Sequence, residues 1–94
     1  MNAPAPILAA CAALADSSRW EILQHIGAEP LSASELAERL PISRQAIARH
    51  LTVLADAGLA EPEQAGRQLR YRALGGRLSE LARQLDRIGR GWDR

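Results

Sequence analysis

The sequence predicts a mainly α-helical domain with one small β-hairpin, and three observations support this fold class. Its 94 residues suffice for a single domain with a modest core. Only three residues are aromatic and none is Phe, so the core has to consist mostly of Leu, Ile and Ala, which favours helices. Apolar residues recur at helical spacing along most of the chain, whereas one short stretch alternates on both sides of a glycine turn.

Four helices are expected before Gly58, which ends the last of them. A tail at residues 1–6 that contains two prolines should be loose. Ser32 and Glu35 have the spacing of a capping box, in which each side chain satisfies a free amide of the other residue. The expected helices span residues 7–15, 19–26, 33–40 and 43–57, the last two separated by a tight turn at Pro41 and Ile42.

A two-stranded hairpin is expected at residues 60–74, followed by a closing helix at residues 77–92. Ala65 and Gly66 form the turn signal, and apolar and polar residues alternate on either side of it. Pro62 places its strand at an edge of the sheet. A helix-turn-helix followed by such a hairpin is a winged helix, in which the hairpin is the wing.

The helix at residues 43–57 has the character of a DNA-recognition helix. Ile47, Leu51 and Leu54 form its core face, and the opposite face carries no acidic residue before Asp56. Arg side chains can pair with guanine, Gln with adenine, and Ala or Thr methyl groups with the thymine methyl. The candidate DNA contacts on this helix are Ser43, Arg44, Gln45, Ala48, Arg49, His50 and Thr52. His50 lies between the two faces, so a phosphate contact and packing at the core edge are both open for it.

The wing adds a second basic segment, since residues 64–77 contain four Arg and no acid. Gly66 and Arg67 form its tip, and Arg67 is the candidate for insertion into a minor groove. Arg70 and Arg72 share one face of the returning strand and are candidates for phosphate contacts. The alternative is that these arginines only keep an edge strand soluble.

The first and last helices each carry a stripe of apolar residues, and one small core cannot cover both stripes. We therefore expect a two-fold symmetric homodimer that covers the remaining apolar side chains. The expected dimer helices, residues 7–15 and 77–92, contribute Ile7, Leu8, Cys11, Leu14, Leu78, Leu81, Leu85, Ile88 and Trp92. The two recognition helices should then lie roughly 34 Å apart, one turn of DNA. Cys11 is the single cysteine, expected to be a buried apolar thiol, and the absence of a signal peptide or membrane-length apolar run favours a cytoplasmic protein.

Several motifs taken together resemble the ArsR/SmtB family of small winged-helix transcriptional repressors. The resemblance covers roughly residues 8–90 and rests on residues 14–19, Ile22, Leu23, 34–37, Ser43, 49–51, Leu54, 57–59, Gly66 and Arg67. It implies a homodimer built on the first and last helices that binds a palindromic operator. It also implies that Arg44, Gln45, Ala48 and Arg49 occupy base-facing positions.

Metal sensing is one property of the resembled family that these residues do not support. The third helix lacks the Cys or His ligands of metal-sensing members, and the last helix carries Glu80 and Asp86 without any His. Two carboxylates alone make a poor transition-metal site, so we expect no metal and no other cofactor. No catalytic constellation is present, and we expect no enzymatic activity. The open alternatives are a winged helix that docks only proteins, such as an antirepressor, and a metal-responsive repressor with an unrecognised site. A small-molecule or protein effector remains open as well.

Overall fold

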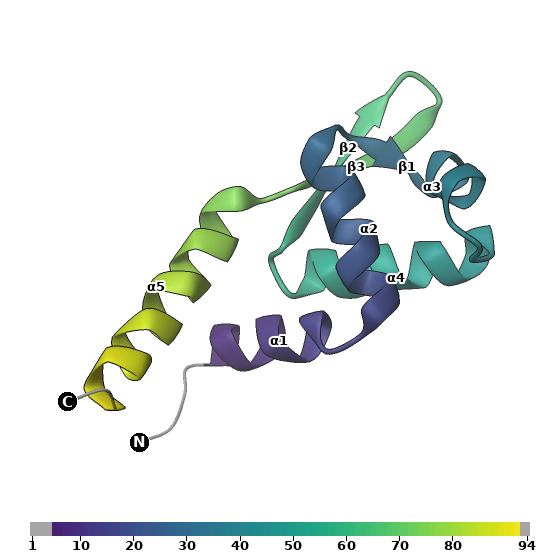
Figure 1. Ribbon diagram of the computed structural model, residues 1–94. Helices are drawn as coiled ribbons and strands as arrows, with labels where there is room; N and C mark the ends of the chain where they lie inside the picture. The colour runs from purple at the N-terminus through teal and green to yellow at the C-terminus, as the bar shows by residue number, and fades with distance from the viewer. Residues whose placement is uncertain (1–4, 93–94) are drawn as a thin grey trace.

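The computed structural model describes residues 5–92, which form five helices and a three-stranded antiparallel sheet (Figure 1). Four helices, the hairpin and the closing helix follow one another in the order expected from the sequence. The elements are α1 (Ala5–Leu14), α2 (Ser17–Ala28), β1 (Leu31–Ser32), α3 (Ala33–Arg39), α4 (Arg44–Asp56), β2 (Ala60–Ala65), β3 (Gln68–Ala73) and α5 (Gly75–Trp92).

The sheet differs from the expected two-stranded wing by one additional strand. Leu31 and Ser32 form β1 and pair with Tyr71 and Arg70 of β3, giving the strand order β1-β3-β2. A strand of two residues shows no alternation, so its sequence carried no strand signal. Pro62 lies in β2 at the sheet edge, as predicted.

Three helices begin earlier than the sequence indicated. Helix α2 spans Ser17–Ala28 where residues 19–26 were expected, because the side chain of Asp16 accepts the amide of Arg19 and caps the helix two residues earlier. Helix α1 starts at Ala5, so Ala5 and Pro6 are helical rather than part of a tail, and Pro is tolerated there because first-turn amides need no helical partner. The remainder of the expected tail, residues 1–4, lies outside the described residues. Helix α5 starts at Gly75, since the carbonyl of Leu74 accepts the amides of Arg77 and Leu78 at 3.1 and 3.4 Å.

The core lies where α2, α3 and α4 pack against one another and against the sheet. Its fully buried large side chains are Ile22, Ile26, Leu31, Leu36, Ile47, Leu51, Leu54 and Leu59. The predicted core face of the recognition helix is therefore confirmed. Helix α5 leaves the sheet and extends away from this core, with the start of α1 lying toward the same end of the molecule (Figure 1).

Candidate nucleic-acid interface

Helix α4 is held by its two ends and by one buried face. The side chain of Ser43 accepts the amide of Ala46 at 3.2 Å, and Gly58 ends the helix with φ of +77°, a conformation that favours glycine. With the leucine and isoleucine face buried, the opposite face is presented to solvent. Its exposed members include Arg44, Gln45, Ala48, Arg49 and Thr52, all predicted candidates for DNA contact.

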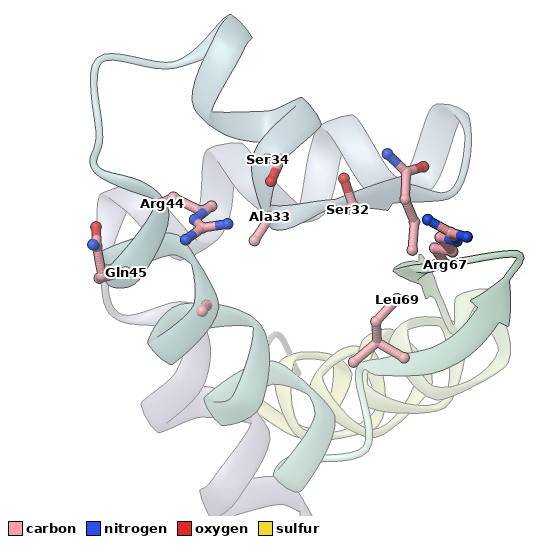
Figure 2. Close-up of a pocket in the computed structure, with 9 residues that line it drawn as sticks. Ser32, Ala33, Ser34, Arg44, Gln45, Arg67 and Leu69 are labelled. Carbon is pink, nitrogen blue, oxygen red and sulfur yellow. The ribbon is translucent and has the colours of Figure 1, made fainter.

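A shallow hollow separates α3 and α4 from the wing (Figure 2). Arg44 and Gln45 lie on one side of it, and Arg67 and Leu69 lie on the other. Its complete lining is Ser32, Ala33, Ser34, Arg44, Gln45, Ala48, Arg67, Gln68 and Leu69. The hollow therefore brings together predicted residues from the recognition helix and the wing tip.

Five residues of this lining were not predicted from the sequence: Ser32, Ala33 and Ser34 at the start of α3, and Gln68 and Leu69 on β3. Leu69 is 47% exposed although its position in the alternation places it with Tyr71 and Ala73, which are half-buried. The pairing of β1 with β3 brings α3 next to the wing, and no local sequence pattern indicates this pairing.

Three of the predicted DNA-contacting arginines form no ion pair within the protein's described residues. Arg44, Arg49 and Arg67 are exposed, and none of them forms an ion pair with a carboxylate of the described residues. Arg67 follows Gly66, whose φ of +63° makes the tight turn at the wing tip. These side chains can bind phosphate or base edges without first breaking a contact within the protein.

Arg70 and Arg72 differ from that group, because each already faces a carboxylate. Arg70 pairs with Glu35 of α3 at 3.0 Å. Arg72 pairs with Glu61 across the hairpin and approaches Glu63 at 3.6 Å. Both arginines do lie on one face of β3, but a phosphate contact by either would compete with these ion pairs.

His50 is half-buried and lies next to α2 rather than on the exposed face of α4. The guanidinium Nη1 of Arg19 donates to its Nδ1 at 3.3 Å. Arg19 also donates through Nε to the carbonyl of Ala13 at 2.7 Å and so links the end of α1 to α4. Of the two alternatives for His50, this geometry favours packing over a phosphate contact.

Glu35 of α3 is held by hydrogen bonds from Ser32 and Arg70 close to the hollow. Its carboxylate accepts the amide of Ser32 at 3.0 Å and the guanidinium of Arg70. The amide of Ser32 and then the Arg70 side chain lower the pKa of Glu35 below its ordinary value. Glu35 is therefore charged at neutral pH, and its carboxylate is paired with the Arg70 guanidinium.

The predicted dimer residues divide into a buried group and an exposed group. Leu81 is buried, and Ile7, Leu14 and Leu78 pack partly against the core, so part of each apolar stripe is covered within one chain. The exposed group consists of Leu8 at 57%, Leu85 at 51%, Ile88 at 48% and Trp92 at 81%. Cys11 is exposed as well, which corrects the expectation of a buried thiol for the single chain, because it lies on the face of α1 that the core does not cover.

Two features are absent from the described part of the chain, a metal-ligand cluster and a membrane-spanning helix. Across residues 5–92, no three side chains of His, Cys, Asp or Glu gather closely enough to hold a metal ion. None of the helices in this part of the chain has the length and apolar character needed to cross a membrane.

The fold and the exposed basic face of α4 define a winged helix-turn-helix protein. Comparisons with known proteins agree, since residues 14–63 match the family model described as a helix-turn-helix domain. An ArsR-like transcriptional regulator from Rhodococcus sp. RHA1 has a similar structure, with a TM-score of 0.89 and 54% identity over 96% of this chain and 85% of that one.

Curated relatives from two other bacteria extend the comparison. The HTH-type transcriptional regulator Rv2034 of Mycobacterium tuberculosis is 40% identical over 81% of this chain and 71% of its own length. A probable mercury resistance operon repressor of Streptomyces lividans is 33% identical over 73% of this chain, which spans only 55% of that protein. This chain belongs to the ArsR family of winged helix-turn-helix transcriptional regulators.

Proposed function

We propose that the protein is a homodimeric repressor that binds a palindromic operator through α4 and the wing. The observation that carries this proposal is the exposed face of α4, which has no acid before Asp56 and lies across a hollow from Arg67. Because Arg44, Arg49 and Arg67 form no ion pair within the described chain, they are free to neutralise phosphate or to pair with guanine.

The proposed contacts divide between the two grooves of DNA. Arg44, Gln45, Ala48 and Arg49 read base edges in the major groove, and the small side chain of Ala48 allows the helix to approach closely. Ser43 lies at the start of this face and donates to a DNA phosphate, whereas Thr52 lies at its far end, where its methyl group contacts a thymine methyl. Arg67 enters the neighbouring minor groove, while the wing follows the phosphates.

Dimerisation through α1 and α5 accounts for the apolar side chains that the single chain leaves exposed. Large exposed apolar patches mark interaction sites in soluble proteins. A two-fold interface would cover Leu8, Leu85, Ile88 and Trp92 with the same residues of a second copy, and Cys11 would be covered with them. The two copies of α4 would then face successive major grooves of a palindrome.

The proposed repressor has no metal site, because α5 offers only Glu80 and Asp86 as carboxylate ligands with no imidazole or thiolate. Release from DNA would follow from an organic ligand, a protein partner or a change in the level of the repressor itself. The proposed ligand is chromosomal DNA, so the protein would act in the cytoplasm.

Selection of duplexes from a random DNA pool, followed by fluorescence anisotropy at several salt concentrations, tests the proposal. We expect a palindromic consensus, a steep salt dependence and two protomers per duplex. The variant Arg49→Ala should weaken binding of the selected duplex by roughly 5- to 150-fold, the range of one bidentate base contact.

The matched control is Arg87→Ala, which removes an exposed arginine of α5 and should leave affinity nearly unchanged. Equally weak binding of selected and scrambled duplexes would refute the operator-binding function. That result would favour a winged helix that docks only proteins.

A further inference from the structure

Arg70 occupies a different position from the other arginines of the wing. Its Nε donates to Oε1 of Glu35 at 3.0 Å, and its Nη2 lies 3.4 Å from Oε2 of the same carboxylate. Glu35 belongs to α3, 35 residues earlier in the chain. The two-point contact therefore joins the middle strand of the sheet to the helix that precedes the recognition helix.

The same carboxylate also completes the cap of α3. Oε1 of Glu35 accepts the amide of Ser32 at 3.0 Å, while Oγ of Ser32 accepts the amide of Glu35 at 3.1 Å. Ser32 is buried and lies directly opposite Arg70 in the pairing of β1 with β3. One side chain thus connects the start of α3, the strand β1 and the strand β3.

This junction lies at the base of the hollow that separates the recognition helix from the wing. Ser32 belongs to the lining of that hollow, and Leu69, the neighbour of Arg70, belongs to its wing side. From Arg70 toward the tip, at residues 63–69, the hairpin is mostly exposed. A two-stranded hairpin is only marginally stable by itself. Its placement therefore depends on contacts at its base.

We propose that Arg70 is a positioning residue, which sets the placement of the wing relative to the recognition helix through Glu35 and does not bind DNA phosphate. The inference rests on the proposed DNA-binding function and assigns one of its residues a different role. Arg72 provides the contrast, because its partners Glu61 and Glu63 belong to the same hairpin and link no second element.

The variant Glu35→Gln separates the two roles of Arg70. Gln is also accepted at this position of a capping box, so the cap of α3 is kept while the charge is lost. If Arg70 positions the wing, Glu35→Gln weakens binding of the selected duplex by roughly 1.5- to fivefold, the effect of losing one partly exposed ion pair. If Arg70 binds phosphate, the same variant frees its guanidinium and tightens binding, which would overturn the proposal.

Glu61→Gln is the matched control, since it removes an equal charge next to Arg72 without a link to α3. We expect its affinity to equal or exceed that of the wild type. A loss in Glu61→Gln as large as the loss in Glu35→Gln would show a general charge effect and would overturn the proposal.

The salt dependence of Arg70→Gln gives an independent measurement. A positioning residue lowers affinity without changing the salt slope, and the double variant Glu35→Gln/Arg70→Gln binds no worse than either single variant. A phosphate contact would instead reduce the slope by about 1. A slope reduced by that amount, or additive losses in the double variant, would overturn the proposal.

The wing placement itself can be measured without DNA. Spin labels at Thr52→Cys in α4 and Gln68→Cys in β3, in a Cys11→Ser background diluted with unlabelled protein, report the distance between recognition helix and wing by electron–electron double resonance. We expect a broader or shifted distance distribution in Glu35→Gln than in Glu61→Gln, with each variant shown to be folded by thermal unfolding. A distance distribution in Glu35→Gln that equals that of the wild type would overturn the positioning role of Arg70. Failure of the DNA selection with wild-type protein would instead refute the proposed DNA-binding function.

Discussion

The exposed stripe of α5 allows the strength of the proposed dimer to be perturbed by a known amount. Leu85 is 51% exposed and Ile88 is 48% exposed, so each has about half of its side chain left to bury in a dimer. Full burial of such a side chain contributes about 1.5–3 kcal/mol, so the remaining half corresponds to about 1 kcal/mol. Two side chains on each of two protomers then contribute about 4 kcal/mol to dimerisation.

The double variant Leu85→Gln/Ile88→Gln should therefore weaken the dimer about 1000-fold, since each 1.4 kcal/mol corresponds to a factor of ten. Gln is a good helix former, so α5 itself should persist. Sedimentation equilibrium over nanomolar to 100-micromolar protein concentrations would measure the dissociation constants of wild type and variant.

The matched control is Leu69→Gln, which changes a leucine of similar exposure on the wing, 47% exposed, away from α5. It should leave the dissociation constant of the dimer unchanged. A wild-type protein that is monomeric at tens of micromolar would refute the reasoning. So would a double variant that dimerises as tightly as the wild type.

Four further predictions concern stability, acid sensitivity and ligands. Leu51→Ala should lower the free energy of unfolding by about 2–5 kcal/mol in urea titrations, because Leu51 is fully buried, and a loss under 1 kcal/mol would contradict the assigned core. Gly58→Ala should cost about 1 kcal/mol, since φ of +77° strains any residue with a Cβ, and equal stability would show that the helix ends differently. The pKa of Glu35 is lowered by the Ser32 amide and Arg70, so its stabilisation is present above the ordinary value of 4.5 and is lost as the pH falls through the lowered pKa. Acid titrations should accordingly show a shallower fall in stability for Glu35→Gln than for wild type, and parallel curves would contradict that pKa. Equilibrium dialysis against zinc should detect no stoichiometric binding, and one ion per protomer or per dimer would restore the metal-responsive alternative.

The sequence alone determined the elements whose cause is local. A capping interaction depends on residues three apart, and the core face of α4 depends on residues three or four apart, so Ser43 and the spacing of Ile47, Leu51 and Leu54 predicted this helix correctly. Gly66 and the alternation around it predicted the hairpin for the same reason. The exposed basic residues of α4 followed from the periodicity once the core face was known.

Only the tertiary structure decided which of the basic side chains already pair with other groups of the protein. Arg70 and Glu35 are 35 residues apart, and Arg19 and His50 are 31 residues apart, so no local pattern links either pair. The same holds for β1, whose two residues become a strand only because β3 lies beside them. Local hydrogen bonding and periodicity specify a helix or a turn, whereas contacts between distant segments form only when the core packs those elements together.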